Sequence, residues 1–541
     1  TPISPIGATN RKGRNNTLDA RPDDPGSPYG IGSSDGGHDV IHPDLGTFDD
    51  FDALVARAGE LGMEVALDLA LQCSPDHPWV GEHPEWFTVL ADGSIAYAEN
   101  PPKKYQDIYP LNFDNDPEGI YAAILEVVRT WISHGVTIFR VDNPHTKPLN
   151  FWQRLIREVR STNPEVLFLA EAFTRPAMMR TLGKIGFHQS YTYFAWRNTK
   201  QELIDYMVEL SQDTAHVLRP AFWPTTHDIL TPFMTNGKVP AFKLRAVLAA
   251  TLSPTWGIYS GYELAESTPR PGFEEQIDNE KYEYKPRDFV AARANGIEDL
   301  LTRLNAARAA HPALQQLRDI WFHPTSDDAL IAYSKRIDAA HSPTGEDDVV
   351  LTVVSLDPSN VREGEVYLNL VQLGLPGDTD GSFPCLRVTD ELTGAAYEWS
   401  GTNYVRLDPF AGRVAHVLRV EPLSVPACGR QWRLPGRTPL DSPDRRPSLK
   451  GHRVRSRHSG TRHRFRSRRA SRPSSRTRRN TRRRHIECVR HDGAGLRAPG
   501  VHPRRPRPAG PAQTGPVTGS GVVPHGRFLR GAAAVLRGLR W

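Results

Sequence analysis

Three acidic residues that stand at or near the ends of apolar segments could together transfer a glycosyl group. Asp142 ends the stretch IFRVD, Glu171 lies in LFLAEAF, and Asp228 lies in WPTTHDIL. Two carboxyl groups about 5 Å apart carry out retaining glycosyl transfer, one as nucleophile and the other as acid and base. Arg140 lies two residues before Asp142 on the same strand face, and we expect it to keep that nucleophile ionised by charge pairing.

Each acid also has a simpler interpretation. An isolated Asp at a strand end is more often a helix N-cap or a salt-bridge partner, and Glu171 alone could be a member of a buried ion pair. The occurrence of three such acids at successive strand ends, with an Arg beside the first, favours the catalytic interpretation.

A repeated βα pattern would bring these distant residues together. The predicted helices include residues 48–62, 118–135 and 150–161, and the predicted strands are residues 63–71, 136–143, 166–173, 188–194, 221–230 and 253–264. This pattern predicts a (β/α)8 TIM-type barrel over residues 1–324, whose active site lies at the carboxyl ends of the strands. Residues 4–7 could be the end of the second strand, and the first strand is absent, so we expect the barrel to be truncated at its N-terminus.

Two further segments follow the predicted barrel. Residues 325–434 contain short alternating strands with Asp, Gly and Pro turns, which predict a small antiparallel β-sandwich domain. Residues 435–541 have no periodicity, and we expect a disordered basic tail. This tail has 27 Arg and 1 Lys against 4 acids, a net charge of +24, whereas the rest of the chain, with 39 basic and 58 acidic residues, carries −19.

The tail has two interpretations. A basic run can bind nucleic acid through phosphate contacts. The near absence of Lys instead indicates translation in a shifted reading frame, so we expect no nucleic-acid partner.

Composition excludes several classes of protein. Apolar runs fall short of the roughly 20 residues that cross a bilayer, so we expect no membrane association. The cysteines are too few for a disulfide framework and too scattered for a zinc site, which indicates a reducing compartment, by default the cytoplasm: Cys73, Cys385, Cys428 and Cys488. The N-terminus shows no export signal, and we interpret it as cut.

Four short motifs resemble the regions that define the α-amylase superfamily, glycoside hydrolase family 13: DLALQC (68–73), IFRVDNPH (138–145), AEAF (170–173) and TTHD (225–228). Longer stretches such as SPIGATNRKGRNNTL, KKYQDIYPLNFD and EKYEYKPRDF resemble one of its subfamilies, the bacterial α-1,4-glucan:maltose-1-phosphate maltosyltransferases. Gln72 and Cys73 stand where amylases have Asn-His, which fits this subfamily better than a starch hydrolase. The resemblance extends from residue 1 to about residue 434.

The resemblance implies transfer of maltosyl units from maltose 1-phosphate to the non-reducing end of an α-1,4-glucan, with retention. It implies that Asp142 is the nucleophile, Glu171 the acid and base, and Asp228 the carboxylate that stabilises the transition state. Residues matching substrate-binding positions of the family are Lys12, Gln72, Asp107, Asn143, Lys281 and Tyr282, with Arg140 and His227 as supporting residues. A homodimer is implied by the family, and this chemistry requires neither a cofactor nor a metal.

Several substrate-binding residues have alternative interpretations. A Lys in a Gly- and Asn-rich loop, such as Lys12, is usually solvated, Gln72 could be a core hydrogen-bond partner, and Asn143 could cap the following helix. A glucan hydrolase, a trehalose-forming enzyme and an inactive truncated product also stay open as functions. Because a barrel without its first strands exposes a strand edge and an apolar face, we expect the chain as given to fold poorly or to be inactive.

Overall fold

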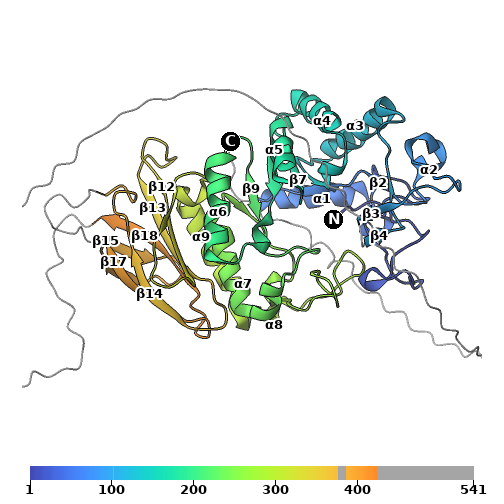
Figure 1. Ribbon diagram of the computed structural model, residues 1–541. Coiled ribbons are helices and arrows are strands. Elements are labelled where there is room, and N and C mark those ends of the chain that lie inside the picture. Colours follow the sequence, from blue (N-terminus) through green and yellow to red (C-terminus); the bar gives the residue numbers. More distant parts are fainter. Residues whose placement is uncertain (101–102, 376–385, 423–541) are drawn as a thin grey trace, which may run out of the picture. The chain divides into compact units, whose positions relative to one another are not determined.

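A computed structural model describes residues 1–100, 103–375 and 386–422, and its N-terminal part is an α/β unit (Figure 1). Six parallel strands form one sheet in the order β1-β6-β7-β8-β9-β10. The strands are β1 (Ala66–Leu69), β6 (Ile138–Asp142), β7 (Leu167–Glu171), β8 (Gln189–Tyr191), β9 (Pro220–Phe222) and β10 (Thr255–Trp256). The predicted parallel α/β arrangement is therefore confirmed as a sheet of six strands, whose edges within the described ranges are β1 and β10.

The central strands are apolar because both faces of the sheet are covered. In β6, Ile138, Phe139 and Val141 are at most 1% exposed, and in β7 Phe168 and Ala170 are fully buried. Parallel strands with helices on both faces typically read as continuous apolar runs. This explains why the pattern at residues 136–143 and 166–173 predicts these two strands to within two residues at each end.

Helices alternate with the strands, and several of them begin at a side-chain cap. The side chain of Thr47 caps α1 (Phe48–Glu60) together with Asp50 in a capping box. Asp116 accepts a hydrogen bond from Gly119 N at the start of α3 (Pro117–Ser133). The other helices are α2 (Pro78–Glu82), α4 (Leu149–Thr162), α5 (Pro176–Ile185), α6 (Lys200–Val208), α7 (Pro232–Leu252), α8 (Phe289–Ala292) and α9 (Ile297–Ala310). No helix in the described ranges combines the length and apolar character that a bilayer crossing needs.

Several strand predictions differ from the structure; β1 and β8, for example, are shorter than the predicted ranges 63–71 and 188–194. The strand predicted at residues 221–230 is β9 and ends at Phe222, and that predicted at 253–264 is the two-residue strand β10. Their apolar residues beyond the strands, such as Ile229 and Leu230, are buried by packing in loops, which imitates a strand pattern. Residues 4–7 do not join the parallel sheet, because Ile6 forms an antiparallel bridge to Ile31 in the N-terminal loop.

An antiparallel sheet follows, in the order β11-β12-β13-β18-β15-β16, and a separate ribbon pairs β14 with β17. The strands are β11 (Ile320–His323), β12 (Leu330–Ile337), β13 (Asp348–Ser355), β14 (Arg362–Tyr367), β15 (Leu386–Asp390), β16 (Ala396–Trp399), β17 (Thr402–Leu407) and β18 (Ala415–Pro422). Residues 423–434 of the predicted β-sandwich domain, and the whole predicted tail, lie outside the described residues.

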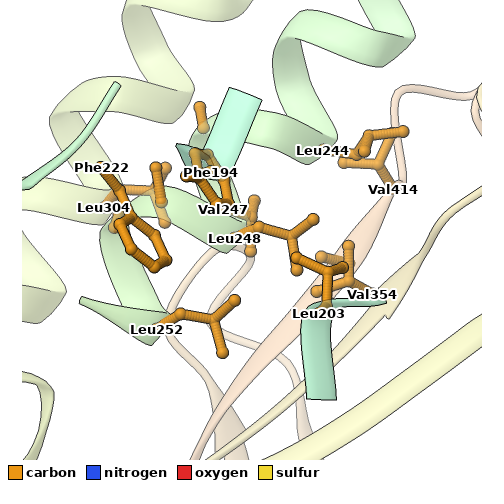
Figure 2. Close-up of a cluster of buried hydrophobic side chains, with 14 of the residues drawn as sticks. Phe194, Leu203, Phe222, Leu244, Val247, Leu248, Leu252, Leu304, Val354 and Val414 are labelled. Atoms are coloured by element: carbon orange, nitrogen blue, oxygen red, sulfur yellow. The ribbon is translucent and has the colours of Figure 1, made fainter. Parts of the chain in front are cut away.

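The two faces of the antiparallel sheet pack against different elements. On one face, Leu351 and Val353 of β13 share a core with Val366 of β14 and Leu407 of β17. On the other face, Val354 packs with residues of α6, α7 and α9 and with the parallel sheet. Figure 2 shows this second core, which includes Phe222, Leu203, Leu244, Val247, Leu248, Leu252 and Leu304. The antiparallel sheet is thus one side of a sandwich and also a wall of the core around α7.

Candidate active site

The structure places two of the predicted catalytic carboxylates on neighbouring strands at the same level. Asp142 is the last residue of β6 and Glu171 the last residue of β7, and the two are register partners. Neighbouring strands lie about 4.8 Å apart, so both side chains leave the sheet at one place. Asp142 is 8% exposed and Glu171 is 9% exposed. The pair therefore occupies a largely dry position at the carboxyl edge of the sheet.

The guanidinium group of Arg140 forms ion pairs with three acidic residues at this edge of the sheet. Arg140 Nη1 lies 2.9 Å from Asp68 Oδ1 and 3.1 Å from Asp142 Oδ1, and its Nη2 lies 3.7 Å from Glu171 Oε1. Asp68 belongs to β1, where it is the register partner of Arg140. Because the cation touches acids from three adjacent strands, it fixes their mutual placement.

The pKa of Glu171 is raised to about 8. Burial is the main cause, and the charges of Asp142 and Asp228 raise it further, against the opposing effect of Arg140. The backbone N–H of Asn143 donates to Glu171 Oε2 at 3.2 Å. A carboxyl group with this pKa is protonated at neutral pH and can act as a general acid.

Asp228 lies in the loop that follows β9, six residues beyond the strand, and is held there by two bases. Lys281 Nζ donates to both carboxylate oxygens, at 3.0 and 3.2 Å, and His227 Nε2 lies 3.1 Å from Oδ2. Burial alone would raise the pKa of Asp228, but Lys281 and then His227 lower it well below its usual value. Asp228 therefore stays a carboxylate, in contrast to Glu171.

Lys12 and Asp107 are buried together at the N-terminal loop. Lys12 is 2% exposed, and its Nζ donates to Gln106 Oε1 at 2.5 Å and to Lys104 O at 3.4 Å. Burial lowers the pKa of Lys12, and burial raises the pKa of Asp107. Asp107 Oδ1 has no hydrogen-bond partner, although the residue is only 4% exposed. A buried oxygen without a donor suits a hydroxyl group of a ligand.

The remaining predicted residues surround the acids at different depths. Gln72 begins the short strand β2 (Gln72–Cys73), and its Nε2 donates to Tyr29 O at 3.5 Å. Asn143 is exposed, with a left-handed φ of 44°, and its side chain does not cap the following helical turn. Tyr282 is 4% exposed, and its ring centroid lies 6.0 Å from Lys281 Nζ.

Some residues at the site carry no signal in the sequence. Tyr29 OH donates to Asp68 Oδ2 at 3.0 Å, and its ring stacks on His227 at 5.9 Å. It therefore links the Arg140 cluster to the Asp228 cluster, yet it lies alone in a Pro- and Gly-rich loop without periodicity. Asp68 could have been found, because it is an acid inside an apolar strand and belongs to the quoted motif DLALQC.

One group of side chains in the described part of the chain has the types and proximity of metal ligands. Atoms of His38, Cys73 and His77 lie within 4.8 Å of one another, and all three residues are buried. His77 Nδ1 accepts a hydrogen bond from Trp79 N at 3.0 Å, so the proton of the neutral ring is on Nε2 and points at His38 Nδ1, 3.0 Å away. His38 Nε2 then donates to Ala70 O at 2.9 Å. These hydrogen bonds use the nitrogen lone pairs that a metal would need, so the group does not fit a metal ion.

Comparison with known proteins finds one family model and several curated relatives that match this chain. A family model described as "GLGE, C-terminal" matches residues 322–420. The chain is 62% identical over 424 residues to the α-1,4-glucan:maltose-1-phosphate maltosyltransferase of Arcanobacterium haemolyticum, which covers 78% of this chain and 61% of that protein. It is 59% identical over 432 residues to maltosyltransferase 1 of Streptomyces coelicolor, covering 79% of this chain and 62% of that protein. The chain thus spans about three fifths of the length of the curated relatives it matches.

Solved structures with a similar fold include two bacterial α-amylases. A maltogenic α-amylase from Thermotoga neapolitana matches with a TM-score of 0.56 and 18% identity, over 77% of this chain and 88% of that one. An α-amylase from Lactobacillus plantarum matches with a TM-score of 0.55 and 22% identity, over 78% of this chain and 89% of that one. At these identities the likeness concerns the fold alone.

Proposed function

The chain is homologous to the α-1,4-glucan:maltose-1-phosphate maltosyltransferases, and from this premise we propose that it transfers maltosyl units from α-maltose 1-phosphate to the non-reducing end of an α-1,4-glucan. The observation that carries the proposal is the register pair Asp142 and Glu171, because two carboxyl groups so placed are the apparatus of a retaining double displacement. We propose no cofactor and no metal for this reaction.

In the first displacement, Asp142 attacks the anomeric carbon and the bond from that carbon to the phosphate oxygen breaks. Glu171, protonated at neutral pH, can give its proton to the departing phosphate. The product is a β-maltosyl ester of Asp142, and inorganic phosphate leaves with the bonding electron pair. Arg140 holds Asp142 in place for the attack through its ion pair at 3.1 Å.

In the second displacement, Glu171 takes the proton from the 4-hydroxyl of the glucan acceptor. The acceptor oxygen attacks the anomeric carbon from the opposite side, the bond to Asp142 breaks, and the α configuration returns. Asp228, held as a carboxylate by Lys281, stabilises the positive charge that develops on the sugar ring in both steps.

Substrate recognition in this proposal uses the polar side chains around the acids, of which Lys12, Asp107 and Tyr282 are buried. Lys12 and Lys281 supply cationic groups for a sugar phosphate. Asp107, with its unpartnered Oδ1, accepts hydrogen bonds from sugar hydroxyls, and the amide of Gln72 both donates to and accepts from them. Asn143 and Tyr282 also bind the substrate in this proposal, because they match substrate-binding positions of the family. His227 supports the site through its contact with Asp228.

The fold and the setting of the enzyme belong to the same proposal. We propose that the six parallel strands are the wall of a (β/α)8 barrel over residues 1–324, followed by a β-sandwich domain over residues 325–434. The scarcity of cysteines supports a cytoplasmic location, and the family supports a homodimer. Light scattering on the purified protein tests the dimer, since a mass of one chain at micromolar concentration would contradict it.

The test of the activity is incubation of the purified chain, beside the full-length Streptomyces coelicolor relative, with α-maltose 1-phosphate and glycogen. Release of phosphate together with lengthening of glucan chains supports transfer. Release of reducing sugar without growth of the glucan indicates a hydrolase, the alternative function within the superfamily. No reaction by this chain, with transfer by the relative, indicates the inactive product that the sequence also allowed.

A further inference from the structure

The segment that carries Lys281 has little regular structure of its own. Residues 265–288 contain neither helix nor strand, yet Lys281 must bring its Nζ to within 3.2 Å of both oxygens of Asp228. A long loop of this kind keeps one conformation only where side chains satisfy its backbone groups. The residues that do so decide the geometry at Asp228.

A buried side-chain amide joins this loop to the Asp228 segment, in addition to the backbone hydrogen bond that Leu230 N donates to Glu274 O at 2.6 Å. Asn279 is 2% exposed, and its Nδ2 donates to His227 O at 3.3 Å and to Gln276 O at 2.9 Å. Its Oδ1 accepts from the backbone N–H of Lys281 at 3.0 Å. One side chain thus contacts the backbone directly before Asp228 and the backbone of the Lys that pairs with it.

We propose that Asn279 is a positioning residue that sets the Lys281–Asp228 ion pair, and that the adjoining Asn15–Asp278 pair fastens the same loop to the Lys12 loop. The inference rests on the proposed maltosyl transfer. Among the described residues, no hydrogen bond joins Asn279 to Asp142, Glu171 or Asp228, so it acts through Lys281 and through the carbonyl of His227.

The second contact joins residues 263 positions apart. Asn15 Nδ2 donates to Asp278 Oδ1 at 2.7 Å, and Asn15 Oδ1 accepts from Asp278 N at 2.8 Å. Both residues have left-handed backbones, with φ of 52° and 51°, a conformation that Asn and Asp adopt more readily than other non-glycine residues. Arg270 Nη1 adds a hydrogen bond to Asn15 O at 3.1 Å. The two-point contact therefore fixes the spacing between the loops that hold Lys12 and Lys281.

The first experiment measures kcat and KM for α-maltose 1-phosphate as a function of pH in Asn279→Ala, with Asn360→Ala in an exposed turn of the antiparallel domain as the matched control. We expect kcat/KM to fall about 10²-fold, because misplacement by about 1 Å costs that much. We also expect the acid limb of the pH profile to move to higher pH, since Asp228 loses its pairing with Lys281. A purely structural role would lower thermal stability without moving this limb.

The second experiment uses the neighbouring pair, so that a folding failure of Asn279→Ala does not end the test. Asp278→Asn keeps the oxygen that accepts from Asn15 and tolerates the left-handed backbone, so we expect activity within about threefold of the unchanged protein. Asp278→Ala loses the oxygen that accepts from Asn15 and tolerates the left-handed backbone less well. We therefore expect kcat/KM to fall at least about tenfold. Equal activity of these two variants, or an unchanged pH profile in a folded Asn279→Ala, would overturn the inference.

A third readout separates this inference from the proposed function. Trypsin can cut the loop after Lys281 and after Arg287, because Arg270 and Lys285 are each followed by Pro. We expect Asn279→Ala and Asp278→Ala to be cut at least about tenfold faster than the control variant. If the unchanged protein releases no phosphate, the proposed function fails, and the rate of cutting alone decides the role of the two contacts. Equal rates of tryptic cutting in all variants would contradict the role proposed for the two contacts.

Discussion

The raised pKa of Glu171 leads to a prediction about the alkaline side of the pH profile. With a pKa of about 8, roughly nine-tenths of Glu171 is protonated at pH 7, and the acid form is lost above pH 8. We therefore expect kcat/KM for the donor to be level between pH 7 and 7.5 and to fall about tenfold per pH unit above pH 8. The donor phosphate has a second pKa of about 6, so its ionisation does not cause the fall in kcat/KM above pH 8.

The perturbation is Glu171→Gln, which keeps the shape of the side chain but removes the proton. We expect kcat to fall by about 10² to 10⁴-fold, the usual contribution of a general acid or base, and the alkaline limb to disappear from the residual activity. Glu60→Gln, on the exposed face of α1, is the matched control and should leave both the rate and the profile unchanged.

Stability gives an independent measure of the same pKa. Between pH 4.5 and about 8 the folded protein holds a proton on Glu171 that the unfolded chain has lost, so stability falls as pH rises through this window. A rise of about 3.5 pH units at 1.36 kcal/mol each sets an upper limit of about 5 kcal/mol on the cost of ionised Glu171. At pH 5 we therefore expect Glu171→Gln to be about as stable as the unchanged protein. At pH 9 we expect the variant to be the more stable of the two.

The assays are phosphate release between pH 6 and 9.5 and thermal unfolding followed by circular dichroism at pH 5, 7 and 9. An alkaline limb that persists in Glu171→Gln would refute the assignment of that limb to this residue. A variant whose stability relative to the unchanged protein is the same at pH 5 and pH 9 would refute the raised pKa itself.

Further changes test other parts of the site and the fold. Asp142→Asn should lower phosphate release at least about 10³-fold, because no ester can form, and activity close to that of the unchanged protein would exclude Asp142 as the nucleophile. Lys281→Met should raise the pKa of Asp228 and so move the acid limb of kcat/KM to higher pH, whereas an unmoved limb would show that the ion pair does not control this carboxylate. Burial lowers the pKa of His311, but its hydrogen bond to Asp348 at 2.8 Å raises it above 6.5, so this pair should stabilise the fold below pH 6.5 and lose its effect as pH rises through the raised value. His311→Gln should remove that dependence from thermal unfolding, and the same pH dependence in both proteins would contradict the charged pair.

The sequence predicted the strands that carry catalytic acids better than the loops that complete the site. β6 and β7 are apolar runs that end in an acid, interrupted in β6 by Arg140, and this local pattern was sufficient to place Asp142 and Glu171. β9 and β10 were predicted too long, because loop residues such as Ile229 are buried by tertiary packing and resemble strand residues. Asp228 was therefore expected on a strand, and it lies in a loop.

Other features of the site depend on contacts that no local pattern encodes. The third partner of Arg140 is Asp68, two strands away from Glu171, and only the pairing of the strands in register brings it there. Tyr29 and Asn279 are isolated residues in irregular segments, and their importance follows from what they bond to. The resemblance to the family supplied Lys281, but it did not predict how that residue is held.

The apolar helix α7 has a consequence for protein engineering. Its residues from Ala241 to Leu252 are buried almost without exception, between the parallel strands on one side and β13 on the other. A chimera that took its antiparallel half from a distant relative would need side chains in that half that pack against α7 as closely as the native ones do. Exchange of the two halves as independent modules should therefore yield aggregates, whereas grafts that carry α7 and β13 together should survive.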